Sequence, residues 1–204
     1  MAITQQVPRR RAKVEKIPEY LVREILNGKV LPYIGYREVL SKEKQLSEIM
    51  GCSSLQSIIT VLITLFLGSR INRKKYFIAS NEAGLHLDKK SNLSNDVAIY
   101  EKEGLVLNNN YFKVAPKIAI EVDIRVDLDP DDHTDKFSYV LEKAQKMIDF
   151  GTQKVIWVMT DSKSIIVFSK TETSIIVNFD TDILVLDDCV LNLGQLLKDE
   201  DIAY

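Results

Sequence analysis

Short apolar runs separated by polar turns dominate the second half of the chain and predict β-strands. After residue 150 the runs are KVIWVM, SIIVFSK, SIIVNF and ILVLDD, a pattern typical of a meander of neighbouring strands. Earlier strand-like runs are YFIAS at 76–80, GLHL at 84–87, DVAIY at 96–100 and KIAIEVD at 117–123. Together these runs predict one sheet, with the meander closing one of its sides.

Three segments before and between these runs have the features of helices. Residues 41–50 predict a short helix that stops at Gly51. Ser53 and Ser54 can cap a second helix, LQSIITVLITLFLG, which ends at Gly68. A third helix is predicted from Thr134 to Gly151, because apolar residues recur on one face at ~100° per residue. That face carries Phe137, Val140, Leu141, Ala144, Met147 and Ile148.

The second predicted helix, residues 54–67, is apolar on nearly every side. Its many β-branched residues leave a pair of strands as an alternative, but its length favours a helix. A helix of this kind is either buried on most sides or packed against a partner chain. A homodimer through residues 54–67 is therefore one expectation for the assembly.

Length and composition indicate one soluble domain. The 204 residues fit a basic arm at 1–16 followed by a single domain at 17–204, and 46% hydrophobic with 27% charged residues is ordinary for a globular protein. The longest apolar run, from Ile58, is about half of the ~20 residues needed to cross a bilayer, so no membrane association is expected. Cys52 and Cys189 lack metal-ligand spacing and indicate reduced thiols of a cytoplasmic protein.

A net charge of -2 gives the chain no overall attraction for nucleic acid. Binding of nucleic acid would need a local basic patch or a metal that offsets the carboxylates. The segment after the second predicted helix offers such a patch, made of Arg70, Arg73, Lys74 and Lys75. Because GxSxG, P-loop and HExxH motifs are absent, hydrolase-triad, nucleotide-kinase and zinc-peptidase functions have no support.

Two carboxylates at the ends of predicted strands are the strongest chemical signal. Asp96 begins one strand, and Glu121 lies near the end of the next in an otherwise apolar run, where an ionised carboxylate is costly unless it is paired or metal-bound. Mg²⁺ prefers such oxygen ligands. Lys143 lies at the edge of the apolar face of the third helix, and its long side chain can extend along the sheet to a strand end.

Each of these residues also has a plain structural interpretation. Asp96 fits a turn at the start of a strand, and Lys143 fits the flank of an ordinary helix. Asp123 fits a third metal ligand, a group that supports the ligands, or an edge residue. Glu24, just before the Asn27-Gly28 turn signal, either completes the metal site or marks the edge of a hairpin.

The order and spacing of these motifs resemble the "putative restriction endonuclease" family, a bacterial branch of the PD-(D/E)xK nuclease superfamily that is abundant in cyanobacteria. The resemblance covers most of residues 18–198. It rests on NDVAIY from Asn95, PKIAIEV from Pro116, a lysine-bearing helix ending at Gly151, and KVIWV from Lys154, with EILNGK at 24–29 and EAGLHL at 82–87.

The resemblance implies an α/β fold with a restriction-endonuclease-like core, a mixed central β-sheet flanked by helices. Asp96 matches the family's aspartate and Glu121 its second acid, while Asp123 stands where the superfamily usually has its lysine. In the family that lysine typically lies eight residues before the helix-ending glycine, which here is Lys143. Asn95 replaces the usual proline, and DIRVDLDPDDHTD replaces a serine-rich turn.

The leading hypothesis is a nuclease that hydrolyses nucleic acid, with DNA as the expected substrate and Mg²⁺ or Mn²⁺ as the cofactor. Asp96, Glu121 and Asp123 would bind the metal, Lys143 would assist the attacking water, and Glu24 would be auxiliary. The alternative is a catalytically degenerate nuclease-fold protein that binds nucleic acid or a protein partner. The acidic net charge and the substituted motif favour this alternative.

Overall fold

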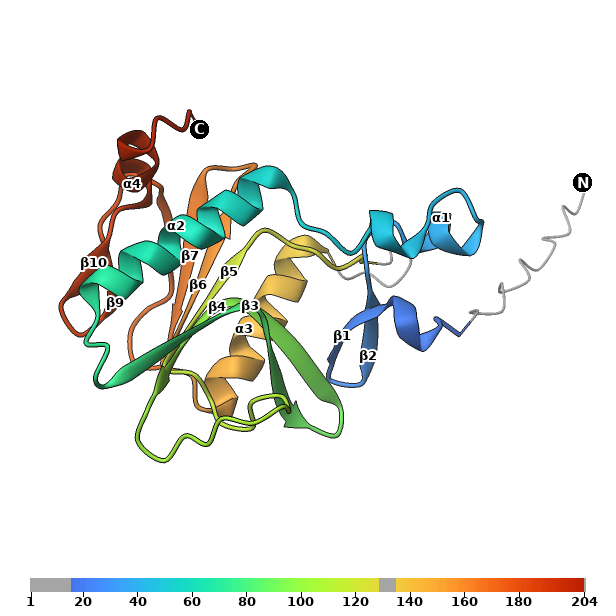
Figure 1. Ribbon diagram of the computed structural model, residues 1–204, viewed down its shortest axis with the longest axis horizontal. Helices are drawn as coiled ribbons and strands as arrows, with labels where there is room; N and C mark the ends of the chain where they lie inside the picture. Colours follow the sequence, from blue (N-terminus) through green and yellow to red (C-terminus); the bar gives the residue numbers. More distant parts are fainter. Residues whose placement is uncertain (1–15, 129–134, 204) are drawn as a thin grey trace, which may run out of the picture.

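A computed structural model describes residues 16–128 and 135–203 of the chain (Figure 1). Most of the predicted arm at 1–16 and the predicted start of the third helix at Thr134 therefore lie outside the described residues. The strands are β1 (Val22–Leu26), β2 (Lys29–Pro32), β3 (Tyr76–Asp88), β4 (Ser91–Glu101), β5 (Ile118–Val122), β6 (Lys154–Met159), β7 (Ser164–Ser169), β8 (Ile175–Asn178), β9 (Ile183–Leu186) and β10 (Cys189–Leu191). The helices are η1 (Glu19–Leu21), α1 (Tyr36–Leu40), η2 (Leu46–Glu48), α2 (Ser54–Arg70), α3 (Lys136–Phe150) and α4 (Leu193–Asp199).

The central sheet of the described chain is mixed, which confirms the predicted fold class. Its strand order is β2-β1-β4-β5-β6-β7-β8. Strands β1 and β5 pair with different parts of one edge of β4, and β3 pairs with the opposite edge. Among the named strands of the described residues, β5 and β6 form the one parallel pair. Helix α3 lies in the connection between them, as a crossover between parallel strands requires. Every residue of β5 is buried, which is typical of a central strand covered on both faces.

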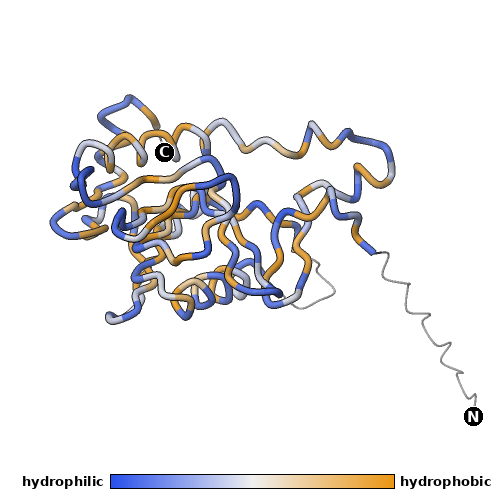
Figure 2. Tube along the Cα trace, turned by 60° about the horizontal axis from the view of Figure 1, so that its bottom comes forward, coloured by the Kyte–Doolittle hydropathy of each residue, from blue (hydrophilic) through white to orange (hydrophobic). Residues whose placement is uncertain are grey.

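Helices cover both faces of the sheet, and each face has its own apolar core. One core joins α2, α4 and the β9–β10 hairpin to the sheet, and the other joins α3 to the opposite face (Figure 1). In Figure 2, hydrophobic segments gather in the strands, whereas α3 alternates between hydrophobic and hydrophilic positions. Within the described residues, no helix is long and apolar enough to cross a membrane.

The prediction of a long helix near residue 54 is confirmed, but this helix is buried on one face only. Ser53 caps α2 by accepting a hydrogen bond from the Gln56 amide. One face of α2 packs into the core, and the other face is exposed along its length. The buried residues are Gln56, Ile59, Leu62, Ile63 and Leu67, and the exposed apolar residues are Leu55, Ile58, Val61 and Leu65.

The apolar face predicted for the third helix is partly wrong. Phe137 and Leu141 are half exposed, at 50% and 42%, whereas Tyr139 and Lys143 are buried. The helix is turned toward the side that carries Tyr139 and Lys143, because these polar groups bind partners inside the protein. Fifteen residues of helix end at Gly151, whose φ of +130° no other residue type adopts easily.

Two local predictions are also corrected. Residues 41–50 form turns and the short 3₁₀ helix η2 rather than a helix, and the helical turn α1 precedes them. The two strands expected around residues 76–87 are one strand, β3, interrupted by a β-bulge at Asn81 and Glu82. The Asn27-Gly28 turn is confirmed: both residues have positive φ and join β1 to β2.

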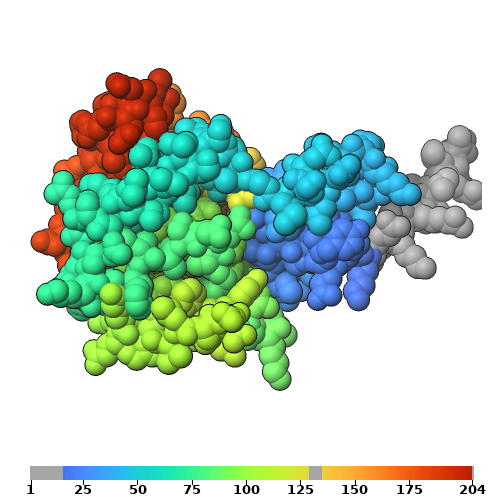
Figure 3. Space-filling view, in the orientation of Figure 1, coloured from blue at the N-terminus to red at the C-terminus, as the bar shows by residue number. Residues whose placement is uncertain are grey.

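Residues 19–52 form a lobe beside the main body, here called the N-terminal lobe (Figure 3). It contains β1, β2, α1 and η2, and β1 attaches it to β4 at the pair Ile25–Asn92. The lobe therefore carries Glu24 to the sheet from a separate part of the molecule.

Gly151→Ala should destabilise the protein, because a Cβ at φ +130° is strained and would lie 3.2 Å from the Ala115 Cβ. We expect the free energy of unfolding to fall by about 1–3 kcal/mol, measured by urea denaturation. Gly51→Ala is the control, since a Cβ there meets no atom within 4 Å and the backbone is ordinary. Equal stability of the two variants would contradict this account of the helix end.

Candidate functional site

The antiparallel register of β4 and β5 places the two predicted carboxylates side by side. Val97 pairs with Ile120, so the next position along each strand brings Asp96 opposite Glu121. The Asp96 carboxylate accepts a hydrogen bond of 2.8 Å from the Val122 amide, which fixes it across the end of β5. Both residues are nearly buried, with exposures of 8% for Asp96 and 5% for Glu121.

Lys143 reaches this strand end from α3. Its Nζ lies 3.1 Å from Glu121 Oε2, 2.8 Å from Glu24 Oε1 and 3.0 Å from the Ser94 carbonyl oxygen. An ammonium group has three N–H donors, and here each one has an acceptor. The structure therefore brings Glu24 and Glu121 into contact with Lys143, and Asp96 stands opposite Glu121 on the neighbouring strand.

Glu24 is the best satisfied of the three carboxylates. Besides Lys143, it accepts hydrogen bonds from the Ser94 amide and hydroxyl, both at 3.0 Å, and from the Tyr139 hydroxyl at 2.9 Å. These donors come from β4 and α3, so Glu24 fastens the N-terminal lobe to both. The hairpin-edge interpretation of Glu24 is wrong, because its side chain is only 2% exposed.

Glu121 has fewer donors. Apart from Lys143 it accepts a hydrogen bond of 3.1 Å from the Asn95 amide group. Asn95 is fully buried, and its Oδ1 makes no hydrogen bond with any described residue. The side chain of Asn95 supplies Glu121 with a hydrogen-bond donor, which the proline of the family that the sequence resembles could not provide.

Gln56 was not foreseen from the sequence. Its Nε2 donates to the Val122 carbonyl at 2.7 Å and approaches Asp96 Oδ2 at 3.4 Å. The residue lies in the first turn of α2 and is 3% exposed, so it holds the helix start against the ends of β4 and β5. A signal was available, because Gln56 is the polar residue on the face of α2 that continues into Ile59 and Ile63.

Asp123 is directed toward the end of β6. Its carboxylate accepts hydrogen bonds from the Thr160 amide and hydroxyl at 2.7 to 2.9 Å, and its carbonyl accepts from the Trp157 indole. Its φ of +60° is in the left-handed region. These contacts fit a group that fixes the strand end, so the side chain at this position does not contact Glu121 as Lys143 does.

Burial and unequal pairing separate the pKa values of the three carboxylates. Burial raises the pKa of Glu121, and the negative charges of Asp96 and Glu24 raise it further. The charge of Lys143 acts in the opposite direction, and the resulting pKa is about 8. Burial also raises the pKa of Asp96, in part offset by the Val122 amide. For Glu24, burial is outweighed by Lys143, Ser94 and Tyr139, and its pKa is lowered.

The pKa of Lys143 is raised well above its usual range. Burial acts to lower it, but the charges of Glu121 and Glu24 prevail. The ammonium stays charged and shared between two acids, with Asp96 as a third acid beside them. Three carboxyl groups around one ammonium leave this cluster short of positive charge.

The predicted basic patch lies at the other end of α2. Gln56 contacts Asp96, whereas Arg70 is 14 residues further along the helix, or about 21 Å at 1.5 Å per residue. Arg70 lies over the Phe66 ring, and Lys75 lies over the Tyr76 ring. Nucleic-acid binding by Arg70, Arg73, Lys74 and Lys75 stays a prediction, and it would require a substrate that extends along the whole helix.

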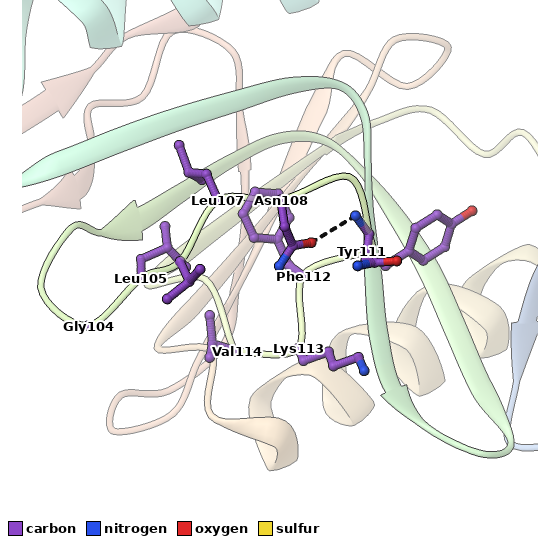
Figure 4. Close-up of a pocket in the computed structure, with 10 residues that line it drawn as sticks. Gly104, Leu105, Leu107, Asn108, Tyr111, Phe112, Lys113 and Val114 are labelled. Carbon is purple, nitrogen blue, oxygen red and sulfur yellow. Dashed lines mark hydrogen bonds between the residues drawn. The ribbon is translucent and has the colours of Figure 1, made fainter.

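Two hollows differ in their relation to the cluster. A hollow of about 390 Å³ lies between the N-terminal lobe and the strand ends, and Ser53, Gln56, Asp123 and Arg125 help to line it. A second hollow, of about 370 Å³, is formed by the 104–114 loop alone (Figure 4). Its side chains are mostly apolar. Glu24, Asp96 and Glu121 line neither hollow, but Gln56, which contacts Asp96, lines the first one. The first hollow is the one next to the candidate site.

Comparison with known proteins identifies the fold. No protein-family model matches the chain, and no curated protein matches it. Its structure is similar to the crystal structure of "a putative nuclease belonging to DUF820" from Anabaena variabilis ATCC 29413, with a TM-score of 0.62. The match covers 86% of this chain and 89% of that chain at 14% sequence identity, so it shows a shared nuclease-like fold.

The raised pKa of Glu121 makes stability depend on pH. The pKa of Glu121 is raised from its ordinary value of 4.5 to about 8. Between these two pH values the folded protein keeps a proton on Glu121 that the unfolded chain has lost. The free energy of unfolding should therefore fall as pH rises through this window. Glu121→Gln should remove about 1 kcal/mol or more of this fall between pH 5 and 8, leaving the part due to Asp96, whose pKa is also raised.

Thermal and urea denaturation across this pH range would test this expectation. Glu142→Gln is the control, because it makes the same charge change on the exposed side of α3. If both variants keep the wild-type slope, Glu121 does not bind a proton in the folded protein near neutral pH. The opposite contribution of Glu24 falls below pH 4.5, because its pKa is lowered.

Proposed function

We propose that the chain hydrolyses phosphodiester bonds of nucleic acid, with DNA as the first substrate to test and Mg²⁺ or Mn²⁺ as the cofactor. The observation that carries the proposal is the contact of Lys143 with Glu121 and Glu24 at the strand ends where Asp96 lies. Residues from β1, β4, β5 and α3 meet there. The nuclease-like fold shared with the Anabaena protein supports the same chemistry.

The donor set fits a hard divalent cation. Asp96 and Glu121 are nearly buried carboxylates in a cluster that is short of positive charge. Within the described residues, no three His, Cys, Asp or Glu side chains are grouped as a complete metal site. Two protein carboxylates suit Mg²⁺, which is commonly held by one or two carboxylates together with water and substrate phosphate oxygens.

Each residue of the cluster has a separate task in this proposal. Asp96 and Glu121 hold the cation, which when bound polarises the phosphoryl group and lowers the pKa of the attacking water. Lys143 fixes Glu121 and supplies positive charge where the transition state gains negative charge. Glu24 and Tyr139 position Lys143, and Gln56 orients Asp96. Asp123 remains a proposed third ligand, and its bonds to Thr160 favour a supporting role.

Asp96→Asn, Glu121→Gln and Lys143→Met should each lower metal-dependent cleavage of supercoiled DNA, on the order of 100-fold or more. The two carboxylate variants should also weaken Mn²⁺ binding measured by calorimetry, whereas Lys143→Met should affect cleavage more than metal binding. Glu142→Gln and Lys136→Met are the controls, because both residues lie on the exposed side of α3 and should leave cleavage unchanged.

The outcomes separate the two functional hypotheses. Metal binding that depends on Glu121, without cleavage of DNA or RNA, would support the catalytically degenerate protein that acts by binding. The absence of metal binding at millimolar concentration, with and without nucleic acid, would exclude the proposed catalysis. Cleavage retained by Glu121→Gln would show that another site carries it.

A homodimer through residues 54–67 remains a proposal for the assembly. The exposed apolar stripe of α2 has no charged residue between Ser54 and Ser69, so two copies could pack without burying charge. Leu65→Lys and Val61→Lys should convert a dimer to a monomer in light scattering. Val106→Lys, on a loop residue that is 76% exposed, is the control. A monomeric wild-type protein at high concentration would contradict the proposal.

A further inference from the structure

Two arginines from different parts of the chain converge on one glutamate near Asp96. Arg23 of β1 contacts Glu82 through both terminal nitrogens, at 3.2 and 3.3 Å. Arg125, which follows β5, forms an ion pair with the same carboxylate. The arginine side chains are only 6% and 13% exposed, whereas that of Glu82 is 37% exposed.

The arginines have other contacts that fix their positions independently of Glu82. The Arg23 guanidinium lies over the Tyr33 ring, 5.4 Å from its centre, and Arg125 donates a hydrogen bond of 3.0 Å to the Met50 carbonyl. Two guanidinium groups thus share one carboxylate, and the carboxylate is the partner nearest to solvent. The planar fork that binds a carboxylate in two places binds a phosphate in the same way.

This arginine pair lies beside the candidate reaction site. Both arginines are close enough to affect the pKa of Asp96, and Arg125 lines the hollow that Gln56 and Asp123 also line. Glu82 lies on the β3 bulge. Because Ser80 pairs with Val97 and Ala83 with Asn95, the two bulged residues stand opposite Asp96.

The β-bulge in β3 determines the direction of the Glu82 side chain. Asn81 and Glu82 have φ values of +63° and +56°, a conformation that such residues adopt at a cost. Bulges are frequent next to functional sites, where they redirect a side chain. Here the bulge directs Glu82 to the two arginines.

We infer that Arg23 and Arg125 form a binding site for a backbone phosphate of the substrate, and that Glu82 occupies this site in the free protein until the phosphate displaces it. This inference rests on the proposed function, because it takes the substrate to be a nucleic acid. It assigns nucleic-acid contact to the α2 start and the strand ends, rather than to the patch around Arg73.

The competing explanation is an ion-pair network that only joins β1, β3 and the segment after β5. That network predicts a loss of stability when Glu82 is changed, without any gain in nucleic-acid affinity. A phosphate site predicts the opposite for affinity, since a competitor for the arginines is removed. The dependence of affinity on salt separates the two, because each lost phosphate contact lowers its slope and a purely structural change does not.

The test is the binding of a short fluorescein-labelled DNA duplex, followed by anisotropy over a series of salt concentrations, in EDTA and again with Ca²⁺. Glu82→Gln should bind several-fold more tightly than wild type. Arg125→Gln should bind more weakly, with a slope of log affinity against log salt reduced by about 0.9. Arg125→Lys should keep the slope and lose affinity, since it retains the charge but not the fork.

Glu101→Gln is the matched control. Glu101 pairs with Lys117 at 2.8 Å, is 33% exposed, and lies at the other end of β4, so the variant makes the same charge change in a similar ion pair. Equal affinity of Glu82→Gln and Glu101→Gln, together with an unchanged slope in Arg125→Gln, would overturn the inference. Circular dichroism melting shows whether each variant folds. If Glu82→Gln does not fold, the affinity and salt slope of Arg125→Lys still test the inference.

A labelled RNA single strand serves as the second probe and distinguishes the two kinds of nucleic acid. If wild type binds or cleaves either probe and the Glu82 and Arg125 variants behave like wild type, the inference fails and the proposed function stands. If no variant binds either probe and none is cleaved, both fail. Tighter binding by Glu82→Gln with no cleavage by any variant supports the phosphate site in a protein that acts by binding.

Discussion

The buried ammonium of Lys143 is the interaction on which the arrangement of the site depends. The Lys143 side chain is only 3% exposed, and a charge this deeply buried is tolerated only when it is fully paired. Glu24 on β1 and Glu121 on β5 provide that pairing. The N-terminal lobe, the central strand and α3 are thereby held in one geometry. The rotation of α3 about its own axis follows from the same constraint, since burial of Lys143 and Tyr139 leaves Phe137 half exposed.

One ammonium cannot balance the carboxylates that the strands deliver. Glu24 has additional neutral donors in Ser94 and Tyr139, and its pKa is lowered, whereas Glu121 is left with a raised pKa. Such a carboxyl group weakens the fold when it ionises and gains most from an added cation. The physical cost of Glu121 to stability and its suitability as a cation ligand therefore have the same origin.

Local patterns foretold the elements of this fold better than their contacts. Alternation and capping residues located the strands, α2 and the Asn27-Gly28 hairpin, and strand-end positions singled out Asp96 and Glu121. Lys143 was found through the spacing of a family resemblance, since a lysine beside an apolar helix face is usually solvated. The partners of Gln56 and the rotation of α3 about its axis could not be foreseen, because both depend on which distant groups offer hydrogen bonds.

The arginine pair was hidden for a further reason, which is that bulges break the period-two alternation on which strand predictions rest. The register of β1 shifts between Val22 and Glu24, and that of β3 shifts at Glu82. Neighbouring residues of β1 have separate partners: Glu24 binds Lys143, and Arg23 binds Glu82. Strand β1 carries both Glu24 of the carboxylate–Lys143 cluster and Arg23 of the arginine pair. Any movement of the N-terminal lobe would therefore change the cluster and the arginine pair together.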